Sequence, residues 1–148
     1  MPYLRITCSE LLISRRREIA QHLTDEIDDL FYHHRAPVSR EELREHTTVH
    51  FTPYREGDMF IGGRTPQERG GIDVTVELSD WSMSERQQRR IARKLTARLQ
   101  QSFGVSTNDV DGINIQFHPY PPKDFAVGGR LLSDVVPLIG RLLKRVLE

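Results

Sequence analysis

The chain contains an internal duplication, and this feature restricts its possible folds more than any other. Residues 48–63 (TVHFTPYREGDMFIGG) and residues 114–129 (NIQFHPYPPKDFAVGG) align without a gap. Each window alternates apolar and polar residues, passes through a Pro-Tyr pair and an aspartate, and ends on Gly-Gly followed by Arg64 or Arg130. Self-similarity of this kind indicates two copies of one structural unit.

The segments in front of the two windows match as well. Alternation of apolar and polar residues over 3–8 and 72–78 predicts one strand in each half. A long amphipathic helix is expected next, at about residues 14–32 in the first half and between Ser84, in a capping-box pair with Gln87, and Gly104 in the second. Each half therefore reads as β-α-β followed by a glycine-rich hairpin, with a one-turn helix before the second strand.

Two β-α-β units of this length can share one core. A strand, a long helix and a returning strand give parallel pairing with a right-handed crossover. The units can join into a four-stranded, mostly parallel sheet with both helices on one face, an α/β or α+β fold. We expect units at residues 1–71 and 72–134 and a tail at 135–148, with a short helix from about Leu138. The bare sheet face predicts an oligomer.

Composition narrows the classes of partner. Among 148 residues, 21 are basic and 21 acidic, so no net charge favours nucleic acid. The apolar stretches are shorter than the ~20 residues that span a bilayer, and no signal peptide pattern opens the chain. The single cysteine, Cys8, cannot form an internal disulfide, which suits a reducing compartment. We expect a cytoplasmic protein without nucleic-acid or membrane partners, and neither a metal motif nor a phosphate-binding loop indicates a cofactor.

Pro2 is the candidate catalytic residue. Once Met1 is removed, the proline nitrogen is a secondary amine at the start of the chain. An ordinary α-amino group titrates at ~7.7–8.0, and burial disfavours its charged form. Such an amine would act as a general base near neutral pH. The alternative is that Pro2 only opens an edge strand, where its missing N–H costs nothing.

Taken together, Pro2 behind Met1, the tandem β-α-β units and the Gly-Gly hairpin that ends each unit resemble the tautomerase superfamily. The two windows are similar to part of 4-oxalocrotonate tautomerase, and the fused length with its linker at 61–71 resembles the cis-3-chloroacrylic acid dehalogenase group. The resemblance implies a homotrimeric barrel and a site around the proline at a subunit boundary. It also implies a cofactor-independent isomerase that shifts a proton in a small keto or enol carboxylate.

The sequence departs from the family pattern at its functional positions. The tautomerase arginine before the first helix aligns with Ile13, and that on the second strand aligns with Thr48. In the dehalogenase group, the two arginines after the third strand align with Asp80 and Met83, and the water-activating glutamate aligns with Val127. A carboxylate-binding or water-activating role must therefore fall to other residues.

Five residues are candidates for binding the substrate. Asn114 aligns with a pocket asparagine of the macrophage migration inhibitory factor branch, and Gln116 shares its strand face. Phe125 aligns with the aromatic residue of the tautomerase hairpin. Arg64 and Arg130 follow the two Gly-Gly pairs and have the geometry to bind a carboxylate.

Three functions remain open from the sequence. The first is the tautomerase activity described above. The second is hydration, decarboxylation or dehalogenation of a three-carbon acid, with a different residue activating water. The third is a catalytically silent trimer that binds a small ligand or a protein, and the unmatched arginines favour it.

Overall fold

The computed structural model describes residues 1–34 and 38–135. Four strands form the main sheet: β1 (Tyr3–Ser9), β2 (Thr48–Tyr54), β3 (Val74–Trp81) and β4 (Ile113–Tyr120). Two long helices follow the first strand of each half: α1 (Ile13–Phe31) and α4 (Glu85–Phe103). The connecting segments hold short elements: α2 (Arg40–Glu45), α3 (Pro66–Arg69), η1 (Thr107–Gly112), η2 (Pro122–Asp124), β5 (Ala126–Val127), β6 (Arg130–Leu131) and α5 (Leu132–Val135).

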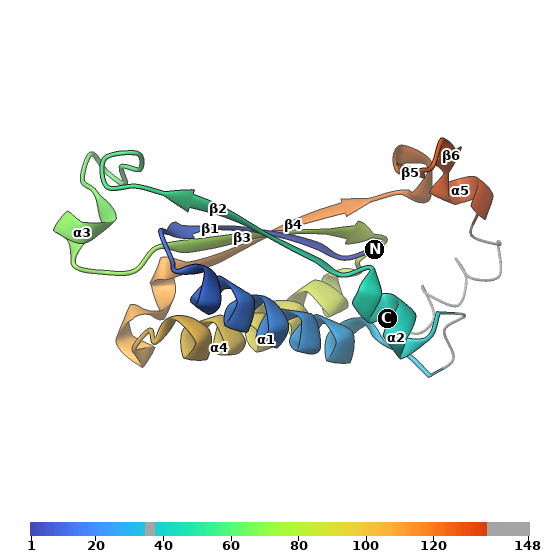
Figure 1. The fold of residues 1–148 in the computed structure, drawn as a ribbon, viewed down its shortest axis with the longest axis horizontal. Coiled ribbons are helices and arrows are strands. Elements are labelled where there is room, and N and C mark those ends of the chain that lie inside the picture. Colours follow the sequence, from blue (N-terminus) through green and yellow to red (C-terminus); the bar gives the residue numbers. More distant parts are fainter. Residues whose placement is uncertain (35–37, 136–148) are drawn as a thin grey trace.

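The sheet has the strand order β2-β1-β3-β4. The pairs β1–β2 and β3–β4 are parallel, while β1 and β3 are antiparallel neighbours at the centre. Both long helices lie on one face of the sheet (Figure 1). The predicted four-stranded, mostly parallel sheet with two helices on one face is therefore confirmed.

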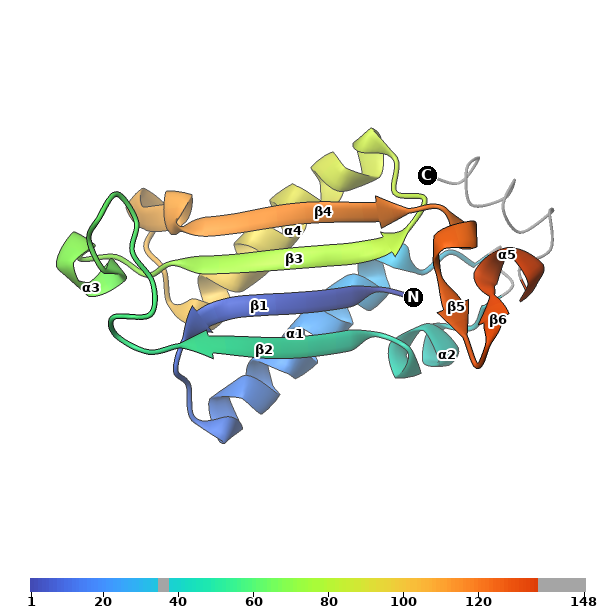
Figure 2. The same cartoon turned by 90° about the horizontal axis from the view of Figure 1, so that it is seen from above.

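The antiparallel contact between β1 and β3 relates the two halves by an approximate two-fold rotation. Tyr3 pairs with Thr48 in the first half, and Thr75 pairs with Asn114 in the second. Because Thr48 and Asn114 begin the two repeat windows, Pro2 corresponds to Val74. Equivalent residues of the two halves consequently lie at opposite ends of the sheet (Figure 2).

The core fills the space between the sheet and the two helices. Alternate residues of the two central strands point into it and meet the apolar stripes of α1 and α4. The following core residues have an exposed fraction of 0%: Leu4, Ile6, Val74, Val76, Leu78, Ile19, Leu23, Ile27, Ile91, Leu95 and Leu99. Burial of such side chains contributes ~1.5–3 kcal/mol each. Asp80 continues the inward row of β3 and is the one charged residue in it.

The other face of the sheet is polar, and no helix of the described part of the chain lies over its middle (Figure 1). The Tyr3 hydroxyl lies 2.7 Å from Nδ1 of His50. Glu77 lies 3.5 Å from the Arg5 guanidinium and 3.6 Å from Nε2 of His118. Charged and hydroxyl groups thus line the face that the sequence analysis expected to be covered by an oligomer.

Short-range signals set the ends of the elements. The Ser84 hydroxyl accepts a hydrogen bond from the Gln87 main chain, and Gly104 ends α4 at φ 66°. The reciprocal half of this predicted capping box does not form, since Oε1 of Gln87 is buried without a partner. Gly62-Gly63 and Gly128-Gly129 adopt positive φ angles at two tight turns, as the hairpin prediction requires.

Two short α-helices were not expected from the sequence. α3 begins with a full capping box between Thr65 and Glu68 and has a proline in its first turn. α5 follows β6 directly, so an element ends at Val135, where the tail was expected to begin. The helix expected from Leu138 lies outside the described residues.

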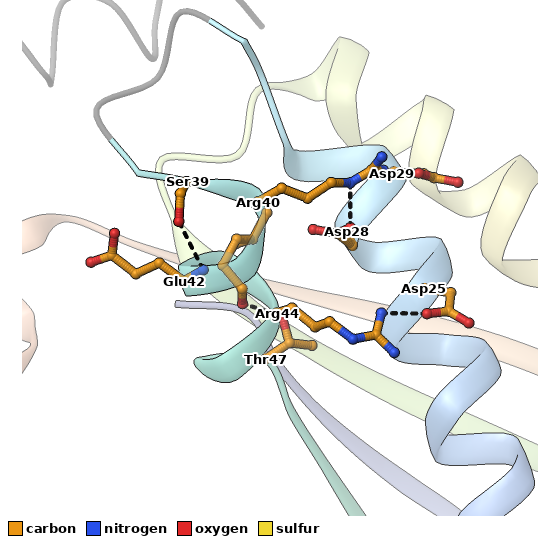
Figure 3. Close-up of polar contacts among 9 residues, drawn as sticks. Asp25, Asp28, Asp29, Ser39, Arg40, Glu42, Arg44 and Thr47 are labelled. Carbon is orange, nitrogen blue, oxygen red and sulfur yellow. Dashed lines mark hydrogen bonds and ion pairs between the residues drawn. The ribbon is translucent and has the colours of Figure 1, made fainter.

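Ion pairs fasten α2 to the acidic second half of α1 (Figure 3). Nε of Arg40 lies 2.5 Å from the buried carboxylate of Asp28, and Arg40 also contacts Asp29. Arg44 pairs with Asp25 one turn earlier. These contacts hold the chain that leads into β2. Among the helices that the structure describes, none is long and apolar enough to cross a membrane.

Candidate functional site

Pro2 is buried at one end of the sheet, where β1 begins. Its carbonyl oxygen accepts a hydrogen bond from the Thr48 main chain at 3.0 Å, which fixes residue 2 beside the start of β2. On the other side lies the end of the antiparallel strand β3, which supplies Asp80. The start of the chain is therefore held between two strands.

A buried carboxylate binds the start of the chain. The amino group of Met1 lies 2.7 Å from Oδ1 of Asp80. The exposed fractions of the two side chains are 36% for Met1 and 2% for Asp80. A carboxylate with so little access to water needs a charged or hydrogen-bonding partner, and the α-amine supplies one.

Tyr120 adds a phenol to the same end of the sheet. Burial, followed by the charge of Asp80, raises the pKa of Tyr120 to about 12. Its hydroxyl oxygen is buried and has no hydrogen-bond partner among the described residues. Phe125 stacks on its ring, with centroids 5.1 Å apart and planes at 22°.

A tight connection brings these groups together. Ser82, immediately after β3, has φ 55°, and its N–H donates to the carbonyl of Tyr120 at 3.2 Å. This bond closes the turn after β3 onto the end of β4. Asp80 and Tyr120, which are far apart in sequence, thereby lie at one end of the sheet together with the start of the chain. We call Pro2, Asp80, Tyr120 and Phe125 the N-terminal site.

The predicted substrate-binding residues separate into two groups along the sheet (Figure 2). Phe125 and Arg130 belong to the segment that follows β4, at the same end as Pro2. Asn114 begins β4, and Arg64 follows β2, both at the opposite end. Gln116 is exposed in the middle of the polar sheet face. A single chain therefore places Phe125 and Arg130 at the same end of the sheet as Pro2, and Asn114 and Arg64 at the opposite end.

Both candidate arginines have free side chains. Arg64 and Arg130 are exposed, and neither side chain forms an ion pair or hydrogen bond within residues 1–34 and 38–135. The Asp80 carboxylate, by contrast, is already bound to the start of the chain. Either arginine is therefore available to bind an anionic partner.

The opposite end of the sheet has the same construction without an amine. Tyr54 corresponds to Tyr120 in the repeat, and its hydroxyl donates to the main-chain carbonyl of Asp73 at 3.1 Å. Cys8 occupies the place that Asp80 has in the other half, and burial raises the pKa of its thiol to about 11. At this end the tyrosine hydroxyl has an internal acceptor, and a thiol stands in the place of the carboxylate.

Asp80 and Tyr120 were not among the residues singled out for the site. Asp80 had a recognisable signal, because a charged residue at the inward phase of a strand requires a buried partner. Tyr120 had a weaker one, its place in the repeated Pro-Tyr pair. In the part of the chain that the structure describes, no three histidine, cysteine or carboxylate side chains gather as metal ligands would.

The fold of this chain is similar to the folds of several solved structures. Residues covering 91% of the chain superimpose on 99% of a fused 4-OT, solved as an asymmetric trimer, with a TM-score of 0.73 and 14% identity. The fold is that of the tautomerase superfamily. The macrophage migration inhibitory factor of Toxoplasma gondii shares this tautomerase fold, with a TM-score of 0.63, 16% identity and coverage of 87% and 98% of the two chains.

A third similar structure was solved in an inactivated form. Pt0534, solved after inactivation by 2-oxo-3-pentynoate, matches with a TM-score of 0.72, 12% identity and coverage of 91% and 99%. No family model and no curated protein sequence matches the chain. At these identities the likeness establishes the tautomerase fold in its fused, two-unit form, and the site must be interpreted from its own residues.

Proposed function

We propose that the protein is a cofactor-independent tautomerase that uses the Pro2 amine as acid and base in the keto–enol isomerisation of a small 2-keto or enol carboxylate. The observation that carries the proposal is the buried position of Pro2 beside Asp80 and Tyr120. A solvent-exposed proline that merely opened a strand would need neither group. The fold shared with tautomerases supports the same reaction class.

Removal of Met1 is the first step in forming the active amine. The freed Pro2 nitrogen then lies where the chain is held by Thr48 and Asp80. A neighbouring carboxylate favours the charged form of an amine, which suits delivery of a proton to the carbon of an enol. Phe125 forms an apolar wall, and Arg130 at the same end is the proposed cation for the substrate carboxylate.

We further propose that the protein acts as a cytoplasmic homotrimer. The fused 4-OT that it resembles was solved as a trimer, and the polar face of the sheet is open in the single chain (Figure 1). A neighbouring subunit could bring its Arg64, Asn114 or Gln116 to the N-terminal site, which the residues of one chain cannot do. This arrangement would place the active site at a subunit boundary.

Activity of a Pro2 variant tests the proposal. The intact mass first establishes that Met1 is absent from the purified protein. Phenylenolpyruvate and 2-hydroxymuconate are then offered to the wild type and to Pro2→Ala. Loss of general acid–base catalysis should lower kcat by ~10²–10⁴-fold. Equal rates in the two proteins, or retention of Met1 in the cellular protein, would contradict the proposal, and the latter would favour a silent binding protein.

Asp80 favours a second candidate, which is hydration, decarboxylation or dehalogenation of a three-carbon acid. The sequence showed no residue to activate water, and the structure places a buried carboxylate beside the start of the chain. A carboxylate in this position can accept a proton from water. Propiolate and the 3-chloroacrylates are the test substrates, and release of a hydrated product or chloride by the wild type, with none by Asp80→Asn, would favour this activity.

A further inference from the structure

The hydroxyl of Tyr120 is a buried donor without an acceptor. Its oxygen is shielded from water and finds no hydrogen-bond partner in the described part of the chain. Leaving such a group unpaired is unfavourable, and native structures nearly always satisfy it. The stacked ring of Phe125 holds the phenol in place at 5.1 Å. The ring is therefore fixed while its polar atom lacks a partner.

The internal repeat shows what this hydroxyl lacks. Tyr54, the equivalent residue of the first half, donates to the main-chain carbonyl of Asp73 at 3.1 Å. Asp73 directly precedes Val74, which corresponds to Pro2. The residue that corresponds to Asp73 is thus Met1. Met1 is present in the structure, and the Tyr120 hydroxyl is nevertheless without a partner in the described part of the chain. The bond that Tyr54 makes therefore has no counterpart at this end of the sheet, whether Met1 is retained or removed.

Tyr120 also has the protonation state of a donor. Its pKa is raised to about 12, so the phenol stays protonated at neutral pH. Close to the phenol lies the Asp80 carboxylate, which is 2.7 Å from the Met1 amine. The carboxylate opposes ionisation of the phenol, and after removal of Met1 the Pro2 amine is the group that would move the proton.

We infer that the Tyr120 hydroxyl donates a hydrogen bond to the carbonyl oxygen of the substrate, which supplies the kind of acceptor that Tyr54 finds in the main-chain carbonyl of Asp73. This role rests on the proposed tautomerase function. The Pro2 nitrogen takes a proton from the carbon next to the carbonyl. The C–H electron pair forms a C=C bond, and the carbonyl pair moves to oxygen. That oxygen accepts the Tyr120 hydrogen bond and then receives the proton from the Pro2 ammonium.

Tyr120→Phe and Tyr54→Phe form a matched pair of variants. Each removes one hydroxyl at equivalent positions of the repeat. Loss of a single donor to a developing oxyanion lowers kcat by ~10²–10³-fold, and we expect this loss with phenylenolpyruvate for Tyr120→Phe alone. Tyr54→Phe should keep its activity but unfold at a lower urea concentration, because it loses an internal hydrogen bond.

Labelling of the amine gives a second readout. Addition of the Pro2 nitrogen to 2-oxo-3-pentynoate forms an N–C bond, places the electron pair of the alkyne on the ketone oxygen and returns the amine proton to carbon. The Tyr120 hydroxyl should stabilise that oxygen, so Tyr120→Phe should be labelled more slowly than the wild type. Mass spectrometry of the N-terminal peptide measures the rate, and Tyr54→Phe is again the control.

The outcomes separate the two ideas. Wild-type rates of turnover and labelling in a folded Tyr120→Phe, with Pro2→Ala inactive, would overturn the role of Tyr120 and leave the proposed function standing. A wild type that neither turns over phenylenolpyruvate nor is labelled at its N-terminus would overturn both. Equal losses in Tyr120→Phe and Tyr54→Phe would also overturn the inference, since the two hydroxyls would then act through the fold.

Discussion

Asp80→Asn tests the pairing of the carboxylate with the start of the chain. The variant keeps the size of the side chain and removes its charge. Breaking a fully buried ion pair costs ~3–5 kcal/mol. Here the Met1 side chain is 36% exposed, and its amine can turn to water once the carboxylate is gone. We therefore expect the loss that is typical of a hydrogen bond to a charged group, about 1.5–3 kcal/mol.

The assay is equilibrium unfolding in urea at neutral pH and at one fixed protein concentration, since assembly adds to apparent stability. The protein is produced with methionine aminopeptidase inhibited, and its intact mass confirms that Met1 is present. Because a buried pair is screened weakly, the loss should persist in about 1 M salt, where the Debye length is ~3 Å.

Glu77→Gln on the same strand is the control. Glu77 pairs with Arg5 on the open face, with exposed fractions of 31% and 49%, so its loss should cost ~0–1 kcal/mol and fade in salt. An Asp80→Asn variant that falls within about 0.5 kcal/mol of the wild type, the range of ordinary surface changes, would refute the reasoning.

Three further predictions concern stability and reactivity. Because the pKa of Tyr120 is raised from 10.0 to about 12, the unfolded chain ionises first, so stability should fall as pH rises from 10 towards 12 and should fall less steeply in Tyr120→Phe. Cys8 is 1% exposed with a thiol pKa of about 11, so iodoacetamide at mildly alkaline pH should label it only after urea is added. Leu95→Ala removes a core side chain that is 0% exposed and should lower the free energy of unfolding by ~2–5 kcal/mol, measured in urea. Each argument has an outcome that would contradict it. These outcomes are a pH dependence of stability that Tyr120→Phe leaves unchanged, prompt labelling of Cys8 in the native protein, and a decrease in the free energy of unfolding below about 1 kcal/mol for Leu95→Ala.

The repeated windows made the fold predictable. Helix periodicity located α1 and α4 to within about one residue at the ends that were named, and Gly104 ended α4 as expected. The two Gly-Gly pairs predicted the turns because both positions require positive φ, which glycine adopts freely. These signals are local, so one sequence suffices to read them.

The site was harder to predict because its contacts are long-range. Met1 and Asp80 lie 79 positions apart and meet through the antiparallel pairing of β1 with β3. Parallel pairing within each half follows from the β-α-β pattern, whereas the way the halves join does not. The short helix α3 could have been found, since Thr65, Pro66 and Glu68 form a recognisable start signal.

The head-to-tail fusion of two equivalent units has a consequence for the number of reactive termini. Two separate units would each begin with a free α-nitrogen, whereas the fused chain has one, and the position equivalent to Pro2 in the second unit is the mid-chain Val74. The end of the sheet around Tyr54 and Cys8 therefore has no terminal amine, and these two residues take no part in the proton transfer proposed for Pro2. Fusion thus converts two equivalent units into one chain in which the two ends of the sheet can acquire different side chains.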